Sequence, residues 1–132
     1  MDISKKVTIV TGASKGIGRA IALKFAEVGS DVVVAGRDTD GLQCTVDAIN
    51  GLGRRALPIN VDVTDSAQVN KMIEQAVDKF SKVDVLVNNA GISSMAPLID
   101  LEEKAWDDVL NVNAKGVFLC CKAAAKQMIK QK

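Results

Sequence analysis

A glycine-rich run near the amino terminus has the residue types that bind phosphate. It reads Thr11-Gly12-Ala13-Ser14-Lys15-Gly16-Ile17-Gly18 and directly follows a short apolar segment. Glycine permits a tight turn and lets the backbone approach an anion without a Cβ in the way. If a helix begins at the end of this run, its free N–H groups point at the same anion. The run therefore predicts a phosphate-binding loop.

Two common phosphate-binding patterns do not describe this run. A Walker loop needs its second glycine where Ile17 stands, and a G-x-G-x-x-G pattern started from Gly16 reaches Ile21 in place of its last glycine. A glycine-rich turn that binds no ligand is the alternative interpretation. The position of the run between a predicted strand and a predicted helix disfavours that alternative.

Several catalytic chemistries are excluded by residue types that the sequence lacks. It contains no His, which excludes Ser-His-Asp and Cys-His nucleophile pairs and any His-ligated metal. It also contains no Tyr. Its three cysteines, of which Cys120 and Cys121 are adjacent, form neither a CxxC metal motif nor a disulfide framework. We predict reduced thiols and no metal site.

Length, composition and charge restrict the possible partners. The 132 residues suffice for one domain, and an apolar content of 48% can supply its core. A net charge of +1 argues against nucleic acid or an anionic membrane as a partner. The amino terminus has no signal-peptide pattern, and no segment has the length of a spanning helix. We expect a cytoplasmic protein with no nucleic-acid or membrane partner.

The elements that must position the glycine run alternate between strands and helices. Apolar, β-branched runs predict four strands, at residues 7–10, 31–35, 56–61 and 83–88. Apolar residues at helical spacing predict helices at 17–28, 41–52 and 66–80. A last helical segment, 101–132, carries an apolar stripe of Trp106, Val109, Leu110, Val117, Cys121, Ala124 and Met128. This predicts an α/β fold, the N-terminal part of a Rossmann-like, doubly wound parallel sheet with strand order 3-2-1-4.

Four motifs of this sequence resemble motifs of the short-chain dehydrogenase/reductase family and follow one another in the same order as in that family. The glycine run has the TGxxxGIG pattern of the family, and Asn88-Asn89-Ala90-Gly91 resembles its NNAG motif. Asp62-Val63 resembles the position whose acidic residue contacts adenine, and Asn113 matches the Asn of the long family helix. The resemblance covers essentially all 132 residues. Among members, the sequence is most similar to 3-oxoacyl-(acyl-carrier-protein) reductases.

The resemblance implies an oxidoreductase that interconverts a carbonyl and an alcohol in a small-molecule substrate. From these motifs, and from the positive charges of Lys15 and Arg37, we expect cofactor binding by Gly12, Ser14, Lys15, Gly16, Ile17, Gly18, Arg37, Asp62, Val63, Asn89, Ala90 and Gly91. The resemblance also assigns a catalytic role to Asn113, which in the family reaches the catalytic Lys through a water. The alternative for Asn113 is a structural amide bonded to neighbouring backbone near the fourth strand.

The sequence departs from the family in its catalytic residues. Members carry a Ser on the next strand and a Tyr-x-x-x-Lys on the next helix, and this sequence has no Tyr. We therefore expect residues 1–132 to form one C-terminally incomplete dinucleotide-binding domain, the cofactor-binding half of an enzyme about twice as long. The chain alone is expected to be inactive. A non-catalytic dinucleotide-binding or assembly module is the alternative.

Two cations favour NADP(H) over NAD(H) as the cofactor. An NAD site places an acid at the end of the second strand to hold the ribose 2′-hydroxyl, but this sequence has Gly36 followed by Arg37. A guanidinium suits the 2′-phosphate of NADP, and Lys15 adds a second charge nearby. Asp38 is the competing residue for an NAD site, one position late. The other alternative is that both cations are only solvated surface charges.

The incomplete sheet predicts self-association. Strand order 3-2-1-4 leaves the strand 83–88 as an open edge and the stripe of the last helix partly uncovered. Unpaired strand edges and exposed apolar patches recruit partners. We expect a homo-oligomer that forms through the last helix, the fourth strand or both.

Overall fold

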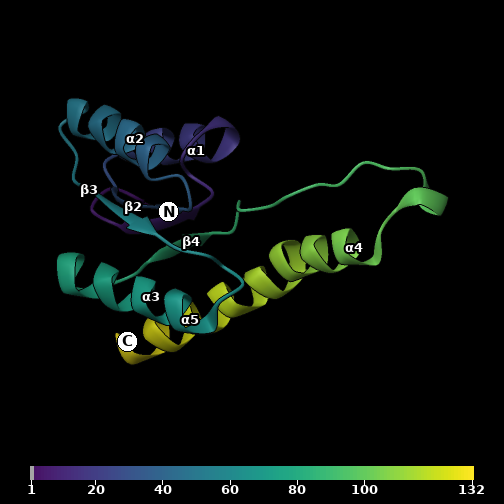
Figure 1. Cartoon of the computed structure of the whole chain (residues 1–132). Helices are drawn as coiled ribbons and strands as arrows, with labels where there is room; N and C mark the ends of the chain where they lie inside the picture. The colour runs from purple at the N-terminus through teal and green to yellow at the C-terminus, as the bar shows by residue number, and fades with distance from the viewer. Residues whose placement is uncertain (1) are drawn as a thin grey trace.

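Strands and helices alternate along most of the chain, as Figure 1 shows. The structure, a computed structural model, describes residues 2–132. Its strands are β1 (Val7–Thr11), β2 (Asp31–Gly36), β3 (Ala56–Asn60) and β4 (Val85–Val87). Its α-helices are α1 (Gly16–Glu27), α2 (Thr39–Gly51), α3 (Ser66–Phe80), α4 (Glu103–Leu110) and α5 (Val117–Lys130). A 3-10 turn η1 (Leu98–Asp100) precedes α4, and a π-helical segment η2 (Asn111–Gly116) joins α4 to α5.

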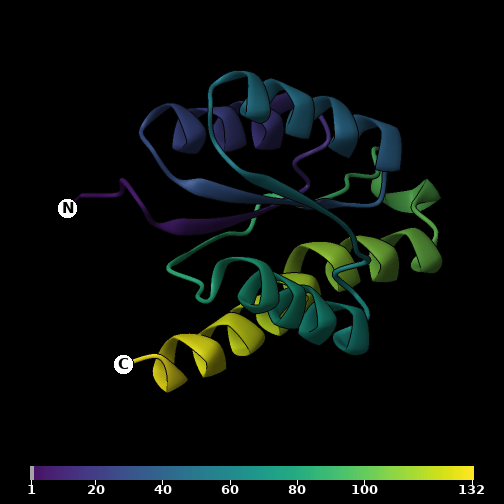
Figure 2. The same ribbon diagram turned by 90° about the vertical axis from the view of Figure 1, so that its left-hand side faces the viewer.

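The four strands form one parallel sheet in the order β3-β2-β1-β4, which confirms the predicted order. Thr8 of β1 lies opposite Val32 of β2 on one side and Val85 of β4 on the other. Helices α1 and α2 cover one face of the sheet, and α3 and α5 cover the other (Figure 2). No helix of residues 2–132 has the length and hydropathy needed to cross a membrane.

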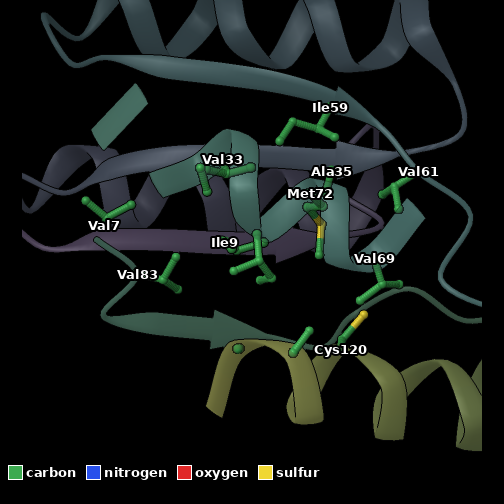
Figure 3. Packing of buried hydrophobic residues seen from close by; sticks show 14 of the residues in the cluster. Val7, Ile9, Val33, Ala35, Ile59, Val61, Val69, Met72, Val83 and Cys120 are labelled. Carbon is green, nitrogen blue, oxygen red and sulfur yellow. The ribbon is translucent and has the colours of Figure 1, made fainter. Parts of the chain in front are cut away.

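The sheet is buried on both faces because successive strand residues point to opposite sides. Val10, Val32 and Val34 pack against α1 and α2. Ile9 and Val33 belong to the second core, against α3 and α5, which Figure 3 shows together with Met72 and Cys120. Each fully buried Val or Ile contributes about 1.5–3 kcal/mol. This double burial explains why the strands are continuous apolar runs.

Two largely buried carboxylates lie at the amino ends of the strands and form ion pairs there. Asp31, at the start of β2, pairs with Arg54 at 3.1 Å and with Arg55. Burial alone would raise the pKa of the Asp31 carboxyl, but the hydrogen bond and charge of Arg55 and the charge of Arg54 hold that pKa below its usual value.

Asp84, just before β4, is likewise a largely buried carboxylate that pairs with two cationic side chains. Its Oδ2 accepts a hydrogen bond from the Val7 N–H at 2.9 Å, and its carboxylate pairs with Lys82 at 2.9 Å and with Lys6 at 3.4 Å. Burial would raise the pKa of Asp84, but the Val7 N–H and the two lysines together lower it. Both acids therefore fix the start of a strand through paired charges.

The predicted apolar stripe of the last segment is only partly right. Trp106 and Leu110 are 55% and 45% exposed, and Cys121 is also exposed. Ala124 is buried as predicted, and Cys120 and Ala123 are buried beside it in place of Cys121. Helix α5 packs against α3 and β4, and its buried residues are those that face this contact.

Candidate functional site

The three glycines of the glycine-rich run have different surroundings. Gly12 and Gly16 have φ of +65° and +56°, in the left-handed region that favours glycine. A Cβ on Gly12 would lie 2.9 Å from Ala90 Cα, and one on Gly18 would lie 2.2 Å from the Gly12 carbonyl oxygen. A Cβ on Gly16 would meet no atom within 4 Å. Gly12 and Gly18 therefore permit close packing, whereas Gly16 leaves open space beside the loop.

The start of α1 differs from the starts of α2 and α3. Asp38 caps α2 by accepting from the Gly41 N–H at 3.1 Å, and Asp65 caps α3 by accepting from the Ala67 N–H at 2.9 Å. At α1 the N-cap residue is Lys15, which makes no side-chain capping bond, and the first turn contains no acid. The positive end of the α1 dipole therefore has no carboxylate of its own and can receive an external anion.

A cavity of about 550 Å³ lies where these loops meet, at the carboxyl ends of the strands. All twelve residues predicted to bind a cofactor line it: Gly12, Ser14, Lys15, Gly16, Ile17, Gly18, Arg37, Asp62, Val63, Asn89, Ala90 and Gly91. Their roles in binding stay predictions. The cavity has the size and position expected for a ligand of an open α/β sheet.

Asn89 holds the glycine run against the loop that follows β4. Its Nδ2 donates to the carbonyl oxygens of Thr11 and Gly12, at 3.0 and 3.1 Å. In return, the Thr11 hydroxyl accepts from the Asn89 and Ala90 N–H groups, at 3.1 and 3.0 Å. The Asn89 amide nitrogen is thus engaged with the protein, and its function in this structure is to position the loop.

Asp62 brings a carboxylate to the cavity. Its Oδ1 accepts from the Thr64 N–H at 2.9 Å and from the Thr64 hydroxyl at 2.7 Å. These two hydrogen bonds lower the pKa of the Asp62 carboxyl against the effect of its partial burial, and the charge of Arg37 lowers it further. The group is therefore an ionised acceptor at the edge of the cavity.

Lys15 and Arg37 are exposed side chains at the same cavity. Within the part of the chain that the structure describes, neither takes part in an ion pair within 4.0 Å. Asp38, the competing residue for an NAD site, also lines the cavity, but its Oδ1 caps α2. Among residues 2–132, Lys15 and Arg37 are unpaired, and the nearby Asp38 carboxylate already accepts a hydrogen bond from the Gly41 N–H. The cavity therefore suits an anionic ligand.

Asn113 does not line the cavity. Its Oδ1 accepts from the Ile92 N–H at 2.9 Å, and its Nδ2 donates to the Ile92 carbonyl at 2.8 Å. The side chain is exposed and lies in η2. The structure therefore gives Asn113 the contacts of an amide that clamps the backbone after β4, and its catalytic role stays a prediction.

The sequence matches the short chain dehydrogenase family over residues 6–132. The chain belongs to the short-chain dehydrogenase family. It is 40% identical over 132 residues to the 3-oxoacyl-(acyl-carrier-protein) reductase FabG of Thermotoga maritima, covering all of this chain and 54% of that protein. It is 39% identical to the (2S)-((R)-hydroxy(phenyl)methyl)succinyl-CoA dehydrogenase subunit BbsD of Thauera aromatica, again over the whole chain and 53% of the relative.

A solved member of the family has the same backbone arrangement. The crystal structure of a short-chain type dehydrogenase/reductase from Mycobacterium marinum is similar with a TM-score of 0.96 and 42% identity, over 98% of this chain and 53% of that one. This short-chain dehydrogenase chain thus spans about half the length of the relatives it matches.

Four residues that line the cavity of this short-chain dehydrogenase chain were not predicted. They are Asp38, Val61, Ile92 and Val112. Asp38 was considered only as a competing residue. The other three each neighbour a predicted residue in sequence, Val61 before Asp62, Ile92 after Gly91 and Val112 before Asn113. Extending the motifs by one residue finds Val61 and Ile92, because consecutive residues at a strand end face the same cavity. Val112 lies in η2, which packs against the loops of the cavity.

Proposed function

We propose that this chain is the cofactor-binding half of an NADP(H)-dependent oxidoreductase that interconverts a carbonyl and an alcohol. One observation carries the proposal: the open glycine loop, the uncapped start of α1 and two unpaired cations meet at one cavity of about 550 Å³. Family membership supports a dehydrogenase or reductase as the whole enzyme. When bound, the nicotinamide dinucleotide supplies the hydride chemistry.

The glycine loop suits a diphosphate. The absence of a side chain at Gly16 leaves room for phosphate oxygens, and a Cβ there would occupy that space. The N–H groups at the start of α1 donate to the same oxygens, without competition from a capping carboxylate. The ionised Asp62 also lines the cavity, and we propose that it accepts a hydrogen bond from an adenine amino group.

Arg37 and Lys15 suit the 2′-phosphate that distinguishes NADP from NAD. A guanidinium can donate two parallel hydrogen bonds to a phosphate, and the ammonium adds a point charge. Each charge-assisted bond contributes about 1.5–3 kcal/mol, a factor of ten or more in affinity. The capping role of Asp38 also favours NADP over NAD. Its Oδ1 already accepts a hydrogen bond from the Gly41 N–H and is less available to a ribose 2′-hydroxyl.

The chain by itself is expected to bind the cofactor without turning over a substrate. It contains no Tyr, the residue that delivers the proton to the carbonyl oxygen in the family. General acid catalysis contributes about 10²–10⁴-fold. The same absence supports the second candidate, a non-catalytic dinucleotide-binding or assembly module. The two differ in whether a second half added in trans restores carbonyl reduction.

We also propose that the isolated chain forms homo-oligomers. Within residues 2–132, β4 pairs with β1 alone, so its other edge is open. Large apolar side chains are exposed along the last segment, at Trp106, Leu110 and Phe118. Light scattering tests this, and a stable monomer contradicts it. Nucleic acid and membranes are not proposed as partners, because the net charge of +1 offers them little attraction.

Calorimetric titration of the purified chain tests the proposed cofactor. We expect NADPH to bind about tenfold or more tightly than NADH, because only NADPH carries the 2′-phosphate. Binding of NADH with equal or higher affinity contradicts the choice of cofactor. Binding of neither dinucleotide contradicts the proposed function as a whole.

A further inference from the structure

The π-helical segment η2 touches two loops of the cavity. Asn113 bonds to the backbone of Ile92 in the loop after β4. At its other end, the buried Gly116 lies against Val63 in the loop after β3. Val63 lines the cavity next to Asp62. One irregular turn of helix therefore contacts the backbone on two sides of the site.

The contact between Gly116 and Val63 has no room for a side chain. A Cβ on Gly116 would lie 2.7 Å from Val63 Cγ2, 3.3 Å from Val63 Cβ and 3.5 Å from the Val63 carbonyl oxygen. The backbone of Gly116 is ordinary right-handed helix, with φ −59° and ψ −42°. Alanine forms such a helix better than glycine does. The close approach of Val63, and not the backbone conformation, is therefore what favours glycine here.

The Val63 loop is also fixed from the other side. The Gln68 Oε1 accepts from the Asp62 N–H at 2.9 Å, and the Gln68 Nε2 donates to Asp65 at 3.0 Å. Thr64 donates twice to the Asp62 carboxylate. A side chain added at position 116 must therefore move the loop against these bonds or push η2 away from it.

We propose that Gly116 is a positioning residue for the adenine end of the dinucleotide site. It acts through Val63, because its missing side chain lets η2 support the loop that presents Asp62 to the cavity. The inference rests on the proposed function, in which this end of the cavity binds adenine. It concerns the affinity for the nucleotide and makes no claim about hydride transfer.

Gly116→Ala tests the inference, with adenosine 2′,5′-bisphosphate and NADP⁺ as probes in calorimetric titrations. We expect Gly116→Ala to weaken both probes about tenfold, since both contain the adenine end. Gly51→Ala is the matched control, because Gly51 ends α2 and a Cβ there meets nothing within 4 Å. The control should leave both affinities unchanged.

A double variant separates positioning from general destabilisation. Val63→Ala removes the Cγ2 atom that the new methyl meets, so Gly116→Ala with Val63→Ala should bind within about threefold of Val63→Ala alone. A merely structural defect would instead lower the unfolding temperature and leave the affinity of the folded protein unchanged. If Gly116→Ala does not fold, the double variant must fold and bind.

Three results overturn the inference: unchanged affinity in folded Gly116→Ala, a loss that Val63→Ala does not rescue, or a double variant that does not fold. Failure of the unmutated chain to bind either probe is a different result. It overturns the proposed function, and the inference with it.

Discussion

At the amino ends of the strands, Asp31 and Asp84 each meet two cationic side chains, whereas at the carboxyl ends Lys15 and Arg37 meet no carboxylate within 4.0 Å among residues 2–132. The amino end satisfies its charges internally. The carboxyl end combines the unpaired Lys15 and Arg37, the uncapped start of α1, and Gly16, where a Cβ would meet no atom within 4 Å. Paired charges stabilise the fold, and unpaired ones around a cavity are available to a ligand.

The two ends should therefore respond differently to substitution. A change at the amino end should alter the free energy of unfolding and its pH dependence, with little effect on ligand affinity. A change at the carboxyl end should lower ligand affinity, and any loss of stability there should be no larger than in a control with the same backbone conformation. A loss of ligand affinity in an amino-end variant, or unchanged affinity in a carboxyl-end variant, would break the comparison.

The largest effect is expected for Gly16→Val. The valine side chain fills the open space beside the loop, and we expect NADPH affinity to fall about 100-fold or more. Gly53→Val is the matched control for backbone strain, because Gly53 also has a positive φ, +74°, and no atom within 4 Å of a Cβ. Both variants should lose similar stability, measured by urea unfolding, and the control should bind normally. Equal affinities in the two variants would contradict the phosphate site.

At the opposite end, Asp31→Asn should lower the free energy of unfolding by about 2 kcal/mol, since a buried carboxylate that pairs with two arginines is lost. The two arginines are partly exposed, so water can hydrate them and limits the cost. Asp78→Asn, at an exposed position of α3, is the control and should change little. A loss of NADPH affinity in Asp31→Asn would show that the two ends are not independent.

The pH dependence of unfolding should report the same paired acids. The folded-state pKa values of Asp31 and Asp84 lie below their ordinary value of 3.8, so the unfolded chain binds more protons in this range. Their contribution is present above about pH 4 and is lost as the pH falls through the folded pKa values. The slope of unfolding free energy against pH should be shallower in Asp31→Asn with Asp84→Asn. An unchanged slope would mean that these pairs do not stabilise the fold.

Much of the fold follows from the sequence because the strands are covered on both faces. Continuous apolar runs predicted all four strands, and the doubly wound pattern predicted their order, although β4 (Val85–Val87) is shorter than the predicted 83–88. Helix α2 begins at Thr39 and not at residue 41, because Asp38 caps it. A cap is a single residue and interrupts no apolar pattern, so the spacing of apolar residues does not reveal it.

The last segment shows where the spacing of apolar residues fails. A regular helical period predicts that Cys121 is buried, yet Cys120 is the buried residue, because α5 packs against α3 on that side. A π-helical turn, η2, precedes α5. The same turn brings Gly116 against Val63. A contact between two residues so far apart in sequence depends on packing, and no local pattern predicts it.

The motifs of the candidate site meet at one cavity for a topological reason. The loops after β1, β2, β3 and β4 all leave the same edge of a parallel sheet, so motifs at four strand ends converge on one cavity. What the motifs could not give is the orientation of side chains. The Asn89 amide bonds to the carbonyl groups of the glycine run, and the Asn113 amide bonds to the backbone of Ile92.

The most direct test of the central claim is the affinity of Arg37→Ala for NADPH and NADH, measured by calorimetry beside the unmutated chain. If the unpaired Arg37 binds the 2′-phosphate, NADPH affinity should fall about tenfold and NADH affinity should stay nearly the same. The unfolding free energy should not change, because Arg37 is exposed and forms no ion pair within residues 2–132. An equal loss for both dinucleotides, or no loss for either, would contradict the claim that the free charges of the carboxyl end select the cofactor.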